Sequence, residues 1–451
     1  MTETTTGATT GATTDYDTID FFTDMSLVDD PFPYFDHLRA KCPVAHLPHH
    51  GVIGVTGYDE AHEVLRKNEL FSSCNAVTGP FPGFIGAPEG VDDMRDYIAA
   101  HRDELPMSEY MVTQDNPTHQ DHRGLIMRLF TPRRMRENEA FMWQLADRQI
   151  DEFIDAGKFE VMRDYGQSFA LLVIADLLGV PEEEHQEFRK QFGALPTVEG
   201  GEGQAFAHDP LGFLVTRFTE FVESRRVEPT NDVVTQIAEA TYGDGSVPPA
   251  EDVARMASFL FAAGQDTTAR VITSALYFIA EHPHIQAYLR EDPARIPNFI
   301  EEVLRMEGPV KSAARMARVT TEVGGVEIPA GTTVSIFPGA ANRDPKRFEE
   351  PNEFRADREN ANQHLAFGRG IHSCPGGPLA RIEAQISVER LLSRTTDVRI
   401  NEAEHGPPEA RRFSQEPIYI LRGIQALHLE FSPAPSAAPG KPSTDEKEVT
   451  S

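Results

Sequence analysis

The sequence contains few of the residues that cross-link a protein. Its 451 residues include three cysteines, Cys42, Cys74 and Cys374, which lie far apart and form no CxxC pair. An odd number of widely separated cysteines argues against a disulfide framework and against a zinc cluster. If the protein binds a metal, this pattern favours ligation through a single cysteine.

Positive charge is also scarce. The chain has 42 Lys and Arg residues against 71 Asp and Glu residues, for a formal net charge of -29, and it contains no basic block. This balance argues against nucleic-acid binding. The first residues, MTETTTGATTGATTDYDTID, lack both the basic region and the apolar region of a secretory signal. We therefore expect a cytoplasmic protein with no membrane anchor at its N-terminus.

The two ends of the chain have few apolar side chains. Residues 1–24 are rich in Thr and Gly, and residues 434–451 are rich in Pro, Ser and charged residues. Both are expected to be disordered tails, because they cannot bury enough apolar surface to offset the entropy of ordering. No long Pro/Gly/Ser-rich linker and no regular repeat divides the sequence between them. We therefore expect one large domain over residues 25–433.

Amphipathic periodicity predicts a mainly α fold with a minor β-sheet region. Helices are expected at 57–69, 119–130, 139–156, 165–179, 208–226, 250–281, 297–307 and 378–394. Short β-rich segments bounded by turn residues are expected at 51–57, 332–338 and 416–423.

The predicted helix at 250–281 is the most informative element. Prolines delimit it at both ends, and roughly thirty residues of helix span about 45–50 Å. Residues 256–265 are uncharged and largely apolar, so we expect burial on every side. Asp266 and Arg270 interrupt the apolar run, which disfavours a membrane span because an acid is costly in lipid.

This helix contains the motif AGQDTT at 263–268. Gly264 weakens a helix by about 1 kcal/mol relative to Ala, and with Ala263 it leaves space beside the backbone for a bulky group. A buried Asp266 needs a partner or a raised pKa, and the hydroxyl of Thr267 or Thr268 can donate to a carbonyl one turn earlier. Asp266 and Thr267 are therefore candidates for proton delivery, although a polar kink that only packs is the simpler explanation of the motif taken alone.

The segment HLAFGRGIHSCPGGPLAR at 364–381 places Cys374 in a glycine-rich loop. A nucleophilic role is disfavoured, because His372 lies two residues away and would point to the opposite face of an extended segment. A purely structural thiol would not need the surrounding glycines. Pro378 fits the first turn of a helix, whose N-terminus would stabilise a thiolate at Cys374. The pattern favours a thiolate ligand to a flat metal cofactor.

The same loop carries a family resemblance. FGRGIHSCPG fits the pattern FxxGxxxCxG and resembles the haem-binding loop of the cytochrome P450 family, with matches at Phe367, Gly370, Cys374 and Gly376. AGQDTT resembles the oxygen-binding helix of that family, EVLR at 302–305 resembles its ExxR helix, and FEEPNEFRADR at 348–358 resembles the segment before the haem loop. The resemblance extends from about residue 30 to about residue 431 and implies a P450-like fold.

The resemblance implies haem b as cofactor, with Cys374 as the iron ligand and Phe367, Gly376 and Gly264 beside the haem. Four further residues match the family's contacts to the haem propionates, namely His119, Arg123, Arg315 and His372. His122 and Arg318 are close alternatives in sequence. In the family the Glu and Arg matching Glu302 and Arg305 form a buried structural network with a later arginine, here Arg358.

The implied activity is that of a soluble, bacterial-type haem-thiolate monooxygenase. Such an enzyme inserts one atom of dioxygen into a hydrophobic small molecule, such as a terpenoid, steroid, fatty acid or aromatic compound, and reduces the other atom to water. Asp266 and Thr267 would relay protons. The sequence has no flavin-binding or iron–sulfur motif, so electrons are expected from separate partners, ferredoxin and ferredoxin reductase.

Three alternatives compete with this interpretation. A peroxide-dependent haem enzyme or a non-enzymatic haem sensor would have little use for the acid–alcohol pair, and a cysteine-dependent hydrolase lacks a suitably placed base. Substrate-cavity segments are expected at 75–88, 195–210 and 309–313 and near Phe413. Lys311 is expected either to hold an anionic group of the substrate or to extend its ammonium towards water or a propionate.

Overall fold

The computed structural model describes residues 15–81, 91–185, 211–230 and 233–435. Its α-helices are α1 (Phe32–Lys41), α2 (Tyr58–Arg66), α3 (Arg95–Ala100), α4 (Thr118–Ile126), α5 (Pro132–Asp151), α6 (Gln167–Leu178), α8 (Gly212–Val227), α9 (Val233–Ala238), α10 (Ala250–Glu281), α11 (Pro283–Glu291), α12 (Ile296–Glu307), α13 (Pro338–Ala341), α14 (Gly377–Arg394) and α15 (Glu402–His405). Its strands are β1 (Val44–His46), β2 (Ile53–Val55), β3 (Phe71–Ser72), β4 (Lys158–Glu160), β5 (Ala313–Ala317), β6 (Thr321–Val323), β7 (Val326–Ile328), β8 (Thr333–Ile336), β9 (Thr395–Ile400) and β10 (His428–Pro433).

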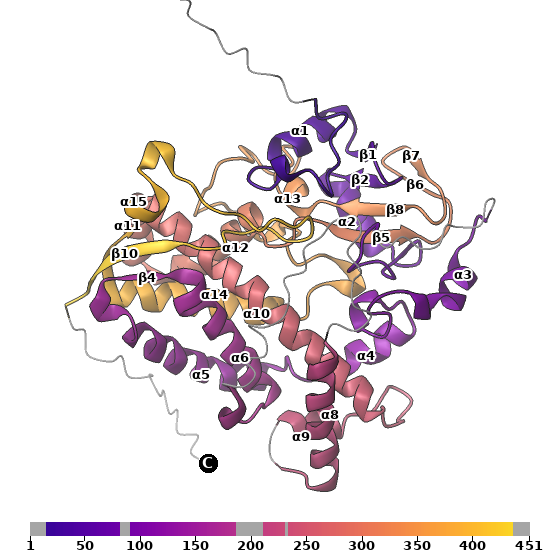
Figure 1. Cartoon of the computed structure of the whole chain (residues 1–451), viewed down its shortest axis with the longest axis horizontal. Coiled ribbons are helices and arrows are strands. Elements are labelled where there is room, and N and C mark those ends of the chain that lie inside the picture. The colour runs from indigo at the N-terminus through magenta and orange to yellow at the C-terminus, as the bar shows by residue number, and fades with distance from the viewer. Residues whose placement is uncertain (1–14, 82–90, 186–210, 231–232, 436–451) are drawn as a thin grey trace, which may run out of the picture.

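The strands gather mainly on one side of the molecule. A five-stranded sheet has the order β1-β2-β8-β5-β3, in which β2 and β8 run parallel and the other pairs run antiparallel. In Figure 1 this sheet lies with α1 and α2 at the upper right, while the larger helices occupy the left and the bottom. The mainly α fold with a minor β region is confirmed.

Helix α10 crosses the molecule between these two regions (Figure 1). Pro249 precedes its first turn, Glu251 and Asp252 lie within that turn, and the helix ends before Pro283. Acidic residues in the first turn complement the helix dipole. The helix packs against α6, α8, α12 and α14, so it forms the axis on which the rest of the core assembles.

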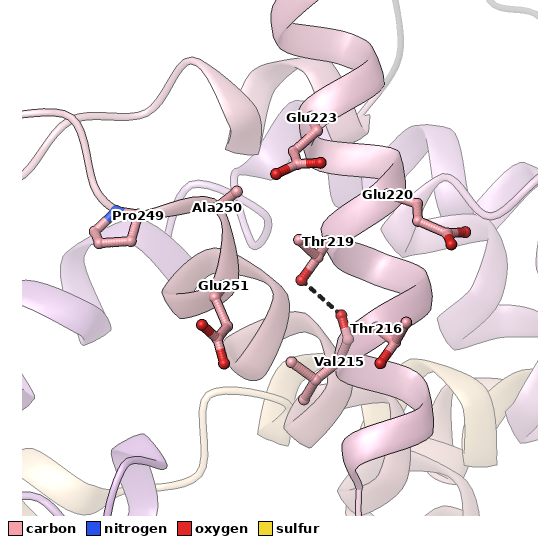
Figure 2. Close-up of a pocket in the computed structure, with 8 residues that line it drawn as sticks. All are labelled: Val215, Thr216, Thr219, Glu220, Glu223, Pro249, Ala250 and Glu251. Atoms are coloured by element: carbon pink, nitrogen blue, oxygen red, sulfur yellow. Dashed lines mark hydrogen bonds between the residues drawn. The ribbon is translucent and has the colours of Figure 1, made fainter.

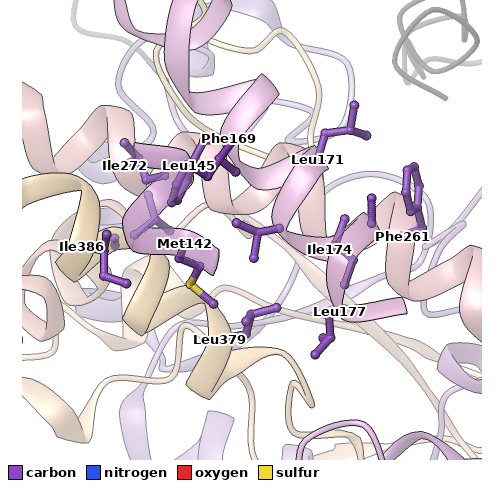
Figure 3. Close-up of a cluster of buried hydrophobic side chains, with 14 of the residues drawn as sticks. Met142, Leu145, Phe169, Leu171, Ile174, Leu177, Phe261, Ile272, Leu379 and Ile386 are labelled. Carbon is purple, nitrogen blue, oxygen red and sulfur yellow. The ribbon is translucent and has the colours of Figure 1, made fainter. Parts of the chain in front are cut away.

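The main core is built from apolar faces of four helices. Figure 3 shows Leu145 of α5, Ile174 of α6, Ile272 of α10 and Leu379 of α14 meeting in one cluster. All four side chains are almost fully buried. Burial of a Leu or Ile side chain contributes about 1.5–3 kcal/mol, so this cluster holds α10 and α14 in fixed relation.

All eight predicted helices are present in the described residues, with shifted ends. The strands predicted at 51–57 and 332–338 correspond to β2 and β8. The strand predicted at 416–423 is wrong, because this segment forms only isolated bridges at its ends, between Gln415 and Ile424 and between Leu421 and Val310. Pro417 has no N–H to donate, which prevents a regular ladder.

The predicted N-terminal tail is too long. Residues 15–24 fold against the domain, and Ile19, Phe21 and Phe22 are buried. The ring of Phe21 lies 4.6 Å from that of Phe337, between centroids. The boundary at residue 24 is therefore wrong, because these three apolar side chains find partners that are distant in sequence. Residues 1–14 and 436–451 lie outside the described residues.

None of the helices in the described ranges has the length and apolar character needed to cross a bilayer.

Candidate functional site

Cys374 lies in a loop whose shape depends on glycine. Gly370 has a φ of 74°. A Cβ atom there would lie 2.5 Å from the carbonyl oxygen of Leu65, so the loop presses directly against the end of α2. The amide of Cys374 donates to the carbonyl of Phe367 at 2.9 Å. These contacts fix the thiol just before the first turn of α14.

The Cys374 thiol is both accessible and desolvated. The residue is exposed, yet burial among protein atoms raises the pKa of the thiol, while the amides of Gly376 and Gly377 and the charge of Arg123 act in the opposite direction. An accessible thiol with a desolvated environment lines an interior hollow rather than the outer surface. The two amides and Arg123 are groups that stabilise a thiolate.

The four predicted propionate partners converge beside this loop, although they come from three distant parts of the chain. The rings of His119 on α4 and His372 in the cysteine loop lie 4.0 Å apart, between centroids. Burial and the charges of Arg315, on β5, and Arg123, on α4, lower the pKa of His372 to about 2. Burial and Arg123 lower the pKa of His119 to about 4. We call these four residues the donor cluster.

The donor cluster has few acceptors within the described residues, and the backbone of Gln114, bonded to His372, is the one that its rings reach. Both ring nitrogens of His119 and Nε2 of His372 are buried without a hydrogen-bond partner. Arg315 donates from its side chain to its neighbouring carbonyl, on Ala314, at 2.7 Å. Within the described residues no carboxylate forms an ion pair with Arg123 or Arg315. Burial lowers the pKa of Arg315 to about 10, which shows the cost of its unpaired charge. Buried cations require anions, so this donor set fits the two carboxylates of a haem.

The two close alternatives point elsewhere. His122 stacks on Tyr242 with a centroid distance of 6.1 Å. Arg318 donates to the carbonyl of Asn68. The structure thus favours His119 over His122 and Arg315 over Arg318 as members of the site. The sequence alone did not decide between them.

The AGQDTT motif borders the same interior. Thr267 Oγ1 donates to the carbonyl of Ala263 at 2.8 Å, as predicted for a hydroxyl one turn later. Residues 263–267 are partly or fully accessible, so the expected burial on every side fails at this end of the segment 256–265. Neighbouring elements therefore do not cover these side chains on all sides, although Ile174 of α6 would lie 3.7 Å from a Cβ atom at Gly264.

Asp266 is paired and only partly buried. Its carboxylate accepts from Nε of Arg270 at 2.7 Å, and Arg270 also donates to Glu416 at 2.7 Å. The Asp266 side chain is 36% exposed, whereas that of Arg270 is 6% exposed. The expected full burial of Asp266 is therefore wrong, but the predicted need for a partner is met by Arg270, which holds the carboxylate ready beside Thr267.

Gly264, Phe367 and Gly376 occupy different surroundings. A Cβ atom at Gly264 would meet Ile174 at 3.7 Å, an ordinary contact, so protein packing does not require glycine there. A Cβ atom at Gly376 would lie 3.8 Å from Cys374 Sγ. The Phe367 ring lies 4.6 Å from the guanidinium of Arg381, which in turn pairs with Glu301. The Glu301–Arg381 pair was not predicted; the doubled acid in EEVLR was its only sequence signal.

Beneath this site lies a second ionic cluster, which we call the framework cluster. Glu302 accepts from Nε of Arg305 at 2.7 Å and from Nε of Arg358 at 3.0 Å. All three side chains are at most 3% exposed. The predicted buried network of the ExxR segment is confirmed.

A separate surface hollow of about 460 Å³ lies between α8 and the start of α10 (Figure 2). It is bordered by the carboxylates of Glu220, Glu223 and Glu251. None of the predicted site residues lines it.

Comparisons with known proteins agree with this geometry. The family model for cytochrome P450 matches residues 195–415. 6-Deoxyerythronolide B hydroxylase of Saccharopolyspora erythraea is 34% identical over 348 residues, which cover 75% of this chain and 82% of that protein. Cytochrome P450 monooxygenase PikC of Streptomyces venezuelae is 31% identical over 409 residues, covering 89% and 91%.

A solved structure is closer still. The substrate-free structure of Mycobacterium marinum cytochrome P450 CYP150A6 is 53% identical in sequence, with a TM-score of 0.88. The match covers 93% of this chain and 100% of that one.

Proposed function

This chain belongs to the cytochrome P450 family, and from that premise we propose that Cys374 holds the iron of its haem b and that the donor cluster holds the haem carboxylates. Members of the family are haem-thiolate monooxygenases, in which the haem supplies the activation of dioxygen for insertion of one oxygen atom into a hydrophobic small molecule. The observation that carries the proposal is the set of buried, unpartnered donors beside an accessible cysteine.

Cys374 and its loop hold the anionic ligand. The amides of Gly376 and Gly377 and the nearby Arg123 lower the pKa of the thiol against the effect of burial. These groups favour the thiolate that ligation requires. The amide of Cys374 donates to the carbonyl of Phe367, and Gly376 leaves the space beside the sulfur free of a side chain.

Arg123, Arg315, His119 and His372 orient the cofactor by donating to its carboxylates. The two arginines supply the positive charge, and neutral His119 supplies one N–H donor. His372 bonds the backbone of Gln114 through its other ring nitrogen, so its Nε2 donates when the ring is protonated. Because the four residues come from α4, β5 and the cysteine loop, binding ties the helical side of the molecule to the sheet.

Asp266 and Thr267 deliver protons on the opposite side of the hollow. When Asp266 leaves Arg270, its carboxylate carries a proton from solvent towards Thr267 Oγ1, which lies on the adjacent residue of the same turn. Gly264 and Ala263 leave the space beside them open. The ion pair with Arg270 and Glu416 keeps Asp266 close to the hollow between turnovers.

Electrons come from separate redox partners, for which we propose ferredoxin and ferredoxin reductase. Arg66 and Arg369 both lie close enough to His62 to lower its pKa, after the effect of burial, and Arg347 adds to this effect. Arg369 belongs to the cysteine loop, and Gly370 of that loop packs against Leu65 and Arg66. A basic patch on a chain of net charge -29 favours an acidic electron carrier. The proposal includes a cytoplasmic location, where the unpaired cysteines stay reduced.

The proton-delivery roles are tested on the haem-loaded enzyme with an electron-donating system. Asp266→Asn is expected to slow dioxygen-dependent turnover with haem content intact, and Thr267→Ala is expected to divert more reducing equivalents to peroxide. Thr273→Ala is the matched control, because Thr273 makes the same hydroxyl-to-carbonyl bond on α10, at 2.8 Å, within the core. Unchanged turnover and coupling in both site variants would remove the relay. Faster turnover with peroxide alone than with dioxygen and electrons would favour the peroxide-dependent alternative.

A further inference from the structure

Lys311 is a largely buried cation that has no ion-pair partner in the described residues. It lies between α12 and β5 and is 6% exposed. Its amide donates to the carbonyl of Ile420 at 2.8 Å, so its backbone position is fixed. Its ammonium has no hydrogen-bond or ion-pair partner in the described residues, and its nearest aromatic ring is that of Phe21, with Nζ 5.7 Å from the ring centroid.

This isolation is unusual within the protein. In the described residues the buried Lys and Arg residues are Arg270, Arg305, Lys311, Arg315 and Arg358. Arg270, Arg305 and Arg358 are ion-paired with carboxylates. The two that remain are Arg315, which belongs to the donor cluster, and Lys311. By the reasoning used for Arg315, an unpaired buried cation indicates an anion supplied from outside the chain.

Neighbouring charges add to this demand for an anion. Burial and the positive charge of Arg422 lower the pKa of Lys311 to about 8. The nearby acid Glu307 is already engaged by Arg343 and Arg422. Glu307 is therefore not free to pair with Lys311, and no ion pair joins Lys311 to any carboxylate of the described residues.

Lys311 lies close to the donor cluster along the chain. It sits at a bend two residues before β5, which carries Arg315 of that cluster. Ala313, between the two, is partly exposed although its neighbours are buried. Four residues span at most about 13 Å, so the backbone of Lys311 lies within about 13 Å of that of Arg315.

The surroundings of Lys311 are apolar. Phe21 and Phe22 belong to an aromatic cluster that includes Tyr419 and the partly buried Phe81 and Ile420. The ring of Phe22 lies 5.2 Å from Tyr419 and 5.8 Å from Phe81, between centroids. Phe81 belongs to the 75–88 segment expected to border the substrate. The apolar part of a ligand whose acid group reached this cation would therefore meet apolar side chains.

We propose that Lys311 binds the carboxylate of the substrate, and that the substrate class is a hydrophobic carboxylic acid oxidised at a position remote from its acid group. The proposal rests on the proposed haem site, since the distance between Lys311 and the donor cluster sets the distance between the acid group and the oxidised position. Arg422 reinforces the positive charge, and the Phe21 cluster excludes water from the contact.

The test compares saturated fatty acids, from octanoic to hexadecanoic, with their methyl esters. Dissociation constants for the haem-loaded enzyme are measured by the spin-state shift of its absorption spectrum. A charge-assisted hydrogen bond is worth about 1.5–3 kcal/mol, so the wild type is expected to bind the best acid roughly tenfold or more tightly than its ester. Lys311→Met is expected to lose this preference, and Lys311→Arg is expected to keep it. Lys346→Met, at an exposed lysine, is the control.

The outcomes separate this proposal from the haem assignment. An equal ratio of acid to ester affinity in the wild type and in Lys311→Met overturns the role of Lys311, as does the absence of any acid that binds more tightly than its ester. In either case an intact spectrum of the carbon monoxide complex leaves the proposed function standing. Loss of that spectrum in the wild type overturns the proposed function itself.

Discussion

Two buried ionic clusters, built largely from the same residue type, lie close together in the protein and have opposite chemistry. In the framework cluster, Arg305 and Arg358 share the carboxylate of Glu302, and their remaining donors reach backbone carbonyls. In the donor cluster, neither Arg123 nor Arg315 forms an ion pair with a carboxylate of the described residues, and the nearby Asp115 is bonded to Ser72 and Ser73. Burial is therefore not the property that distinguishes a structural arginine from a ligand-binding one.

The distinguishing property is whether the protein satisfies the charge itself. A buried cation that is paired within the chain stabilises the fold without any cofactor, whereas an unpaired one costs free energy until a ligand arrives. The framework cluster is expected to matter for folding, and the donor cluster for retention of the haem. Substitutions in the two clusters should thus have effects of opposite kind.

Glu302→Ala should have the largest effect, because it leaves two buried guanidinium groups unpaired. Breaking a buried pair costs about 3–5 kcal/mol, so we expect a large loss of stability and little folded protein. Denaturant unfolding measures this loss. Glu291→Ala, which breaks an exposed pair with Arg295, is the control and should cost less than about 1 kcal/mol. Equal stabilities for the two variants would contradict the framework role.

Glu301, with His364 and Arg381, forms a further cluster whose charges are paired within the protein. It extends the comparison, because its contribution to stability should depend on pH. Burial raises the pKa of Glu301, but hydrogen bonds from His364 and Arg381 outweigh this effect and lower the pKa from 4.5 to about 2. This cluster should therefore contribute about 3 kcal/mol of stability above pH 4.5, which is lost as the pH falls towards 2.

The control for this dependence is Glu301→Gln, which cannot titrate. Its stability should be lower than that of the wild type at neutral pH and should change less between pH 4.5 and pH 2. Parallel pH profiles for the two proteins would show that Glu301 is not the group responsible.

Arg315→Met should have the smallest effect on stability. Unlike Glu302→Ala, it should not destabilise the haem-free protein. Removal of an uncompensated buried cation should leave the haem-free protein at least as stable as the wild type. The loss of a charge-assisted hydrogen bond, worth about 1.5–3 kcal/mol, should speed haem transfer to apomyoglobin roughly tenfold or more. Arg318→Met, whose side chain points to Asn68, should not. Strong destabilisation of haem-free Arg315→Met would place this residue in the framework instead.

The features predicted well from the sequence are those encoded locally. The helix at 250–281 carries its own stop signals and apolar pattern, and the glycine loop before Cys374 is a contiguous motif. The ion pair of Asp266 with Arg270 is also local, one helical turn apart, although the sequence predicts only that Asp266 needs a partner and does not identify Arg270 as that partner. By contrast, the bond of Arg270 to Glu416 joins residues far apart in sequence, and no local pattern announces it.

The errors have the same origin. Phe21 and Phe22 lie in a segment that is otherwise polar, and their burial depends on Phe337 and Tyr419, which arrive from the other end of the chain. The segment 416–423 is apolar enough for a strand, but Pro417 and its distant contacts make it an irregular turn. Long-range packing decided both cases against the local signal.

The most direct test of the account is the difference spectrum of the dithionite-reduced protein with and without carbon monoxide, on the wild type and on Cys374→Ala. The account predicts a strongly red-shifted Soret band in the wild type that is absent from the variant, which identifies thiolate ligation through Cys374. Folded, haem-supplied wild-type protein without that band, or a variant that keeps it, would contradict the assignment of Cys374 as the iron ligand.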